Sequence, residues 1–346
     1  MAQKPEKLQK VEFLNGGADS FIVNKEGALA QLPASLLPQL LPADKLLMPD
    51  GVTSIAEHYR SFSNRNLLDN WYFAKPINQN GKSEYVGNGY GIDRWVSTNS
   101  KLTVSVQDDC IRLTTAESGH GYLRHLFEEP LPAGTYTYSA LVRGTGEGFF
   151  SVTSSANNDG IFGPNAYISN PGADWTLVTN TFTTAESVLR QAYFRCNTGT
   201  SYEIRACKLE SGPFQTLAHM EGNTWVPNDP PPNYALELLK CQRHQFTSGG
   251  RESIYNLAIG TATSNKIVDF FLPLPTSMRT KAAVSFSNLY VSNSAIHHKV
   301  SRIENYGNVA NGVWLHVTTE DSNLTTGQAY YLRTANPFSF ILDANL

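Results

Sequence analysis

The chain has 346 residues, a formal net charge of −3 at pH 7 and only 16% charged residues. A nucleic-acid partner needs a positively charged surface, so this charge balance argues against one. No window approaches the 18 consecutive apolar residues of a membrane-spanning helix, and the N-terminus lacks the apolar core of a signal peptide. We therefore expect two or three domains, made in the cytoplasm, with no membrane insertion.

The polar residues are mostly Ser, Thr, Asn and Gly, and they accompany 16 Tyr and 17 Phe. This composition suits strands and tight turns. It also suits a sugar-binding surface, because amides and hydroxyls meet sugar hydroxyls while flat rings meet their C–H faces. An ordinary all-β protein explains the composition nearly as well. The four cysteines, Cys110, Cys196, Cys207 and Cys241, have no metal-binding spacing, so we predict free, buried thiols.

Residues 1–64 contain a series of Leu-Pro and Met-Pro pairs, ending at Met48-Pro49. The prolines forbid a continuous helix, so we expect an irregular Leu/Pro-rich segment. Exposed leucines at this density require a covering surface. That surface is either another chain of a larger assembly or the next domain of the same chain.

Residues 65–213 have the pattern of an antiparallel β-sandwich. Tyr136, Tyr138, Ala140 and Val142 alternate with more polar residues, as in a half-buried strand. The predicted strands are residues 101–106, 110–115, 121–127, 135–143, 148–153, 175–183, 190–196 and 202–209. The long irregular stretch 154–174 is rich in Asn and Gly, as binding loops often are.

A linker and a short helix are predicted over residues 214–245. The proline-rich run 227–232 is stiff and extended, and Tyr234–Arg243 is an amphipathic helix too short to be stable alone. Residues 246–346 then form a second β-sandwich, with strands at 253–260, 266–272, 282–291, 312–319, 328–333 and 338–342.

Two sets of motifs resemble one family. Asn66-Leu67-Leu68-Asp69-Asn70, Gly91-Ile92-Asp93-Arg94-Trp95 and Lys208-Leu209-Glu210-Ser211-Gly212 resemble the β-jelly-roll modules, similar to carbohydrate-binding modules, of bacteriophage tail-fibre and receptor-binding proteins. The run from Pro232 to Arg243, followed by Leu272–Arg279, looks like the C-terminal receptor-binding domains of phage tail fibres. The resemblance covers residues 66–346. It implies a jelly roll at 65–213, a receptor-binding β-domain at 246–346 and a location in the virion tail fibre.

Catalytic and metal signatures are absent from the sequence. There is no GxSxG or HExxH motif, and the acidic pairs Asp108-Asp109 and Glu128-Glu129 read as turns. We expect no catalytic residue, no metal site and no cofactor, although a structural calcium is compatible with a module of this type.

These observations predict a non-catalytic phage tail-fibre or receptor-binding protein that attaches the virion to host-surface glycans. Residues 1–60 would bind phage tail or baseplate proteins, and the helix leucines Leu236 and Leu239 would meet on the axis of a homotrimer. Two alternatives remain open at this stage. One is a secreted bacterial polysaccharide-binding adhesin, and the other is a tail-associated polysaccharide depolymerase.

The candidate sugar-binding residues are aromatic rings in polar surroundings. The first group contains Tyr290, His297, His298, Tyr306 and Trp314. It lies at a predicted tip, residues 282–323, in which the runs 292–294, 305–308 and 311–312 are predicted turns. The second group, Phe162 and Tyr167, lies in the 154–174 stretch. Trp95 and Trp175 are expected in the core, whereas Trp71 is expected at the surface.

Overall fold

The computed structural model describes residues 20–25, 28–33, 63–154, 163–186, 188–249, 256–293 and 296–344. The chain divides into two compact units, Met1–Ser63 and Asn64–Leu346. The described residues form antiparallel sheets with one short helix. The prediction of an all-β, antiparallel fold is confirmed. No helix within these ranges is long and apolar enough to cross a membrane.

The first unit contains a β-hairpin. Strand β1 (Ser20–Lys25) pairs with β2 (Ala28–Pro33), with Ser20 opposite Pro33. The first Leu-Pro pair therefore ends a strand, and the prediction of an irregular segment was wrong at this point. Proline is tolerated there because a strand's terminal residue need not donate to the ladder. The later Leu-Pro pairs lie outside the described residues.

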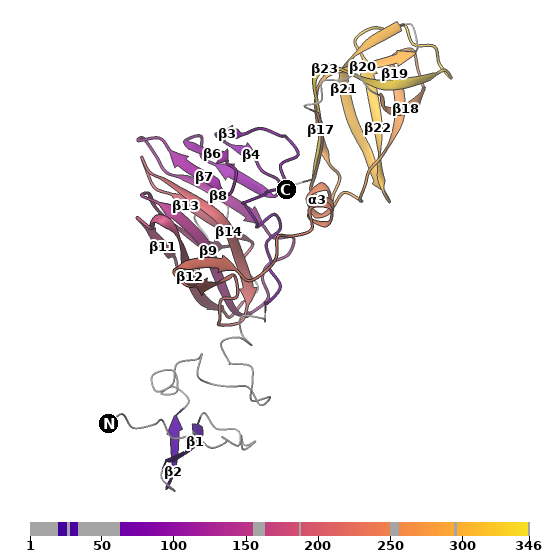
Figure 1. The fold of residues 1–346 in the computed structure, drawn as a ribbon. Coiled ribbons are helices and arrows are strands. Elements are labelled where there is room, and N and C mark those ends of the chain that lie inside the picture. The colour runs from indigo at the N-terminus through magenta and orange to yellow at the C-terminus, as the bar shows by residue number, and fades with distance from the viewer. Residues whose placement is uncertain are drawn as a thin grey trace. The chain divides into compact units, whose positions relative to one another are not determined.

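The second unit begins with two six-stranded sheets, which Figure 1 shows in purple to salmon. The β8 sheet contains, in spatial order, β11 (Ala166–Ser169), β10 (Glu147–Thr153), β13 (Gln191–Cys196), β8 (Gly121–Leu126), β5 (Trp95–Thr98) and β4 (Gly89–Tyr90). The β9 sheet contains β12 (Gly172–Thr184), β9 (Gly134–Gly144), β14 (Ser201–Ser211), β7 (Ile111–Thr115), β6 (Leu102–Val106) and β3 (Glu84–Val86).

One hydrophobic core contains residues from both sheets. Tyr138 of β9 meets Phe150 of β10 at a ring-centroid distance of 4.6 Å, and Trp95 meets Phe194 at 5.9 Å. Such aromatic pairs add stabilisation beyond the area that they bury. Trp95 is fully buried, as expected. The expectation for Trp71 was wrong, because its ring is buried in the same core.

The helix α3 (Tyr234–Gln242) follows a second hairpin formed by β15 (Ala218–Glu221) and β16 (Thr224–Pro227). The side chain of Asn233 caps the helix by accepting from the amide of Leu236 at 3.2 Å. The predicted helix is confirmed. Its buried residues are Glu237 and Cys241, whereas Leu236 is 62% and Leu239 is 38% exposed.

The remaining strands form one seven-stranded sheet with its own core. The order is β17 (Gln245–Gly249), β23 (Ala329–Asp343), β18 (Asn256–Ala262), β19 (Ile267–Pro273), β22 (Gly312–Thr319), β21 (Ile296–Val309) and β20 (Ala283–Asn293). Because β20 also pairs with β23, the sheet closes on itself.

Two predictions in this final sheet were wrong. The predicted strands 328–333 and 338–342 are parts of one continuous strand, β23. The predicted turn at residues 305–308 lies inside β21, where the pairing with β22 shifts between Asn305 and Gly307. A β-bulge accommodates the polar residues and the glycine without ending the strand.

All four cysteines are free and buried, as predicted. Burial raises the pKa of the Cys110 thiol to about 12 and that of Cys207 well above its usual value. These thiols are therefore un-ionised packing groups at neutral pH.

Candidate functional site

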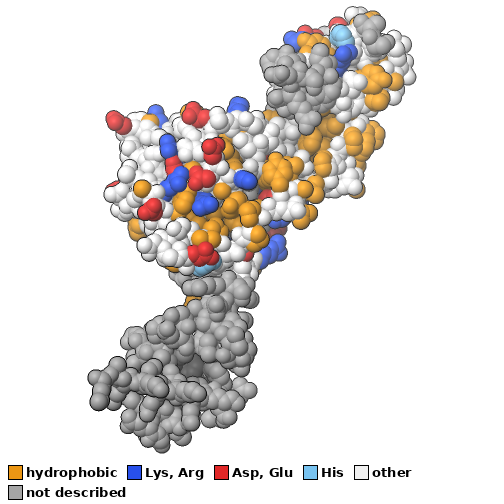
Figure 2. Space-filling model, viewed as in Figure 1, with side chains coloured by type: hydrophobic (Ala, Val, Ile, Leu, Met, Phe, Trp, Pro, Cys, Tyr) orange, Lys and Arg blue, Asp and Glu red, His pale blue; other side chains and the backbone are white. Residues whose placement is uncertain are grey.

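The outer face of the closed sheet exposes large aromatic side chains. Along β22, Val313, Leu315 and Val317 point into the core and are at most 1% exposed, whereas Trp314 between them is 47% exposed. The alternation settles which set of β22 side chains faces outward. Hydrophobic patches are visible on this part of the molecule in the space-filling view (Figure 2).

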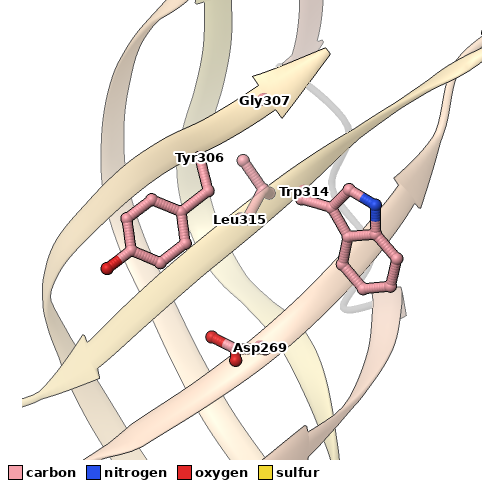
Figure 3. A pocket seen from close by; sticks show the side chains of 5 residues that line it. All are labelled: Asp269, Tyr306, Gly307, Trp314 and Leu315. Carbon is pink, nitrogen blue, oxygen red and sulfur yellow. The ribbon is translucent and has the colours of Figure 1, made fainter. Parts of the chain in front are cut away.

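Tyr306 and Trp314 lie on either side of a hollow of about 300 Å³ (Figure 3). Asp269 of β19, Gly307 of β21 and Leu315 of β22 complete its lining. Gly307 pairs with Trp314, and a Cβ at Gly307 would meet no atom within 4 Å. The missing side chain therefore leaves the hollow open beside the indole ring.

A histidine is hydrogen-bonded to the carboxylate of Asp269 beside the hollow. The imidazole Nδ1 of His316 donates to Oδ1 of Asp269 at 2.7 Å, and the His316 ring lies 4.6 Å from that of Tyr306. Phe271 packs against Trp314 at a ring-centroid distance of 5.4 Å. The hollow thus offers two exposed rings, both held by neighbouring rings, and a carboxylate that accepts hydrogen bonds.

The other residues predicted at this tip lie elsewhere. Tyr290 and His297 form an edge-to-face ring pair at 6.4 Å, and Nδ1 of His297 lies 2.8 Å from the hydroxyl of Ser292. The expectation that His298 offers a ring to solvent was wrong. His298 is 2% exposed and its Nδ1 lies 2.8 Å from Asp321, because its side chain points to the core side of β21.

A second hollow, of about 540 Å³, lies on the outer face of the β8 sheet. Its lining combines rings, amides, a hydroxyl and a guanidinium: Phe149, Asn165, Tyr167, Arg195, Asn197 and Thr198. Tyr167 belongs to β11, so part of the predicted irregular stretch is a strand. It is 70% exposed. The predicted residue Phe162 lies outside the described residues.

The register of the strands brings the aromatic and basic side chains of the second hollow into one row. Tyr167 pairs with Phe149, Phe149 with Arg195, and Arg195 with Tyr122, so four strands contribute one transverse row. The core-facing neighbours Phe150 and Phe194 alternate with the row. Phe149 and Arg195 were not among the residues predicted from the sequence, although their alternation with buried residues is a usable signal for an outward face.

Within the described ranges, no group of three or more His, Cys, Asp or Glu side chains is arranged to hold a metal ion. Asp269 and His316 were not predicted from the sequence either. Both lie on strands with outward polar positions, but nothing in the sequence indicates that β19 and β22 are neighbours.

No protein-family model matches the sequence, and a search of the curated proteins found no match. Among solved structures, the chain is similar to the CBM22-1–GH10 modules of Clostridium thermocellum xylanase 10B complexed with xylohexaose. The identity is 11%, with 43% of this chain and 29% of that chain covered, and the TM-score is 0.31.

Two further solved structures are similar to this chain, with comparably low identities and TM-scores. The enzymatically active domain of bacteriophage CBA120 tailspike protein 4 has 10% identity, with 34% of this chain and 19% of that chain covered, at a TM-score of 0.29. A CBM4 structure has 16% identity over 42% of this chain and 99% of that chain, at a TM-score of 0.30. The chain thus spans less than a third of the first two structures. Similarities this low establish neither a shared family nor a shared function.

Proposed function

We propose that this chain is a non-catalytic glycan-binding protein that attaches a phage particle to the host surface as part of a tail fibre. The observation that carries the glycan-binding part of the proposal is the hollow in which Tyr306 and Trp314 flank the carboxylate of Asp269. Exposed rings beside a hydrogen-bond acceptor are the groups that a sugar ring needs. Its C–H face packs on an aromatic ring while its hydroxyls donate to the carboxylate.

The charge of this hollow favours a neutral sugar. The carboxylate of Asp269 is bonded to His316, and Glu304, which is opposite His316 in the register, adds a second carboxylate that is paired with Arg302. An anionic sugar would meet a like charge there. Each stacking contact contributes on the order of 1 kcal/mol, so a single hollow binds weakly. Several copies acting together would raise the overall affinity.

The other parts of the chain have assigned roles in this proposal. Residues 1–60 bind a tail or baseplate protein, α3 brings three copies together, and the protein is located in the virion. The order of the segments supports this polarity, because the hollow lies in the last domain and the Leu-Pro series in the first 60 residues. A secreted bacterial adhesin would use the same sugar chemistry without a virion partner.

The proposal is tested in two steps. The purified full chain is first screened on an array of neutral oligosaccharides, and its affinity for the best ligand is then measured by calorimetry. We expect Trp314→Ala and Tyr306→Ala each to weaken binding of the best array ligand about fivefold or more, with little change in melting temperature. Tyr331→Ala is the matched control, because Tyr331 is similarly exposed and belongs to the same transverse row, three strands away. Unchanged binding in both tip variants would overturn the assignment of this hollow.

A further inference from the structure

The hollow on the β8 sheet differs in charge from the one around Asp269. Its lining contains a guanidinium, that of Arg195, and no carboxylate. We propose that this hollow is a second, independent binding site, which takes an acidic sugar unit through the carboxylate of a uronic-acid residue. The proposal does not depend on the hollow in the last domain, since the residues of the two sites share no strand.

Arg195 is placed to accept an anion. Its guanidinium lies 5.2 Å from the ring centroid of Phe149 and 6.0 Å from that of Tyr122, so the planar group is held between two aromatic side chains. Its Nε is buried with no hydrogen-bond partner among the described residues. No ion pair joins Arg195 to a carboxylate in that part of the chain either. A guanidinium matches a carboxylate with two parallel N–H···O bonds.

Two arginines of the opposite sheet are paired within the chain. On the β9 sheet, Arg112 and Arg143 both pair with Glu203, and Arg143 also pairs with Asp109 at 3.2 Å. Arg143 stacks on a ring as well, at 4.3 Å from the centroid of Trp175. An arginine therefore stacks on an aromatic ring on each of the two sheets. For Arg112 and Arg143 the carboxylate comes from the chain itself, whereas Arg195, like Arg205 of the β9 sheet, has no carboxylate partner within the described residues.

Other ionisable groups lie near Arg195. Arg124 packs on the other side of the row, 4.8 Å from the ring of Tyr122. The pKa of His120 is lowered by burial and, to a smaller extent, by the positive charge of the nearby Arg195. Glu147 is one row away on the same face, but no ion pair joins it to Arg195. Within the lining of the hollow, Arg195 is the one charged side chain, and its charge favours an anion there.

The rest of the lining suits the remainder of a sugar. Tyr167 presents an exposed ring, and Asn165 lies beside it with Nδ2 3.5 Å from the phenol oxygen. Asn197 and Thr198 add an amide and a hydroxyl at the other side. The volume of about 540 Å³ lies within the range of small-molecule sites. A uronic-acid unit can thus stack on Tyr167, bond to the amides and direct its carboxylate to Arg195.

The test compares two probes on the full chain by calorimetry: a galacturonic-acid tetrasaccharide and the neutral galactose tetrasaccharide of the same length. We expect the acidic probe to bind at least tenfold more tightly, with an affinity that falls as salt rises. Arg195→Gln should reduce its affinity at least tenfold, and Tyr167→Ala should reduce it several-fold. Arg195→Lys should recover part of the loss, since it keeps the charge but not the planar fork.

Two controls make the outcome decisive. Arg112→Gln removes the same charge from the other face of the domain, while Glu203 keeps Arg143 as a partner. Trp314→Ala removes the ring of the other hollow. Both should leave the affinity for the acidic probe unchanged. Equal binding of the two probes, no binding of either, or equal losses in Arg195→Gln and Arg112→Gln would each overturn the proposal.

Discussion

Nε2 of His244 lies 3.0 Å from Oε1 of Glu128, which joins the end of α3 to the segment that follows β8. Arg243 reaches the other oxygen of the same carboxylate at 3.1 Å. On α3 itself, the carboxylate of the buried Glu237 accepts a hydrogen bond from the amide of Asn70. The jelly roll and the segment that leads to the last domain are therefore connected by charged and polar groups, which makes this junction sensitive to pH and to single substitutions.

Gln79 is one such connection. Its Nε2 donates to Asp93 and to the carbonyl of Gln245 at 2.7 Å, and its Oε1 accepts from the amide of Thr247 at 3.4 Å. We expect Gln79→Ala to increase amide hydrogen exchange of β17 about tenfold, because each bond of this kind contributes on the order of 1 kcal/mol. Exchange measured by mass spectrometry checks this.

Gln215→Ala is the control for that experiment, because among the described residues the side chain of Gln215 bonds only to its neighbours Leu217 and Ala218. Exchange in β17 should not change in this variant. Equal acceleration in both variants would show that the effect is a general loss of stability.

Acidification should destabilise the folded chain. Burial lowers the pKa of His244 to about 3 and that of His125 well below its usual 6.5, with Arg94 lowering both further. Nε2 of His125 accepts from the amide of Asp69 at 3.1 Å, so protonation there would break a hydrogen bond. Below pH 6.5 the unfolded chain takes up protons that the folded chain does not, so the free energy of unfolding falls with pH.

The titration of Asp93 has the opposite effect on the free energy of unfolding. Burial raises its pKa to about 6 from the usual 3.8, so between these values the folded chain takes up the proton first and gains stability. Two histidines outweigh one aspartate, so the free energy of unfolding should fall as the pH is lowered from 6.5 to 5. In His244→Gln the loss between pH 7 and 5, measured by urea unfolding, should become smaller. An unchanged slope would show that His244 does not titrate as described.

The exposed leucines of α3 predict self-association. We expect native mass spectrometry to find a homotrimer at micromolar concentration, because Leu236 and Leu239 are exposed in the single chain and three copies could cover them. Leu236→Gln with Leu239→Gln should give monomers. Val86→Gln, which changes an equally exposed residue of β3, should not. A stable wild-type monomer would contradict the prediction.

Removal of residues 1–60 should separate attachment to the particle from glycan binding. The boundary lies within the unit Met1–Ser63, so the truncated chain keeps the whole of Asn64–Leu346. We expect its melting temperature and its binding to cells to be retained, and its incorporation into tails to be lost. Lost cell binding with retained tail assembly would reverse the proposed polarity.

The strands that the sequence predicted well are those with clean alternation. All eight predicted strands of the jelly roll are present, because residues such as Tyr138 and Val142 mark one face every second position. The strand β21 was missed because Asn305, Gly307 and Asn308 resemble a turn. Only its pairing with β22 shows that the chain continues as a bulged strand.

The candidate sites could be predicted only in part for a related reason. Tyr306 and Trp314 were found because rings in polar surroundings are conspicuous in a sequence. Asp269 and His316 are 47 residues apart, and their contact depends on the register of β19 with β22. The row through Phe149 and Arg195 likewise depends on which strands are neighbours, which the alternation within one strand does not specify.

The most direct test of glycan recognition measures how the labelled, purified chain binds to bacterial cells after two different surface treatments. On a strain that the chain binds, periodate oxidation of surface sugars should abolish binding, whereas protease treatment should leave it intact. Trp314→Ala together with Arg195→Gln should reproduce the effect of periodate on untreated cells. Binding that survives periodate and is lost after protease treatment would show that the receptor is a protein, and would contradict glycan recognition by this chain.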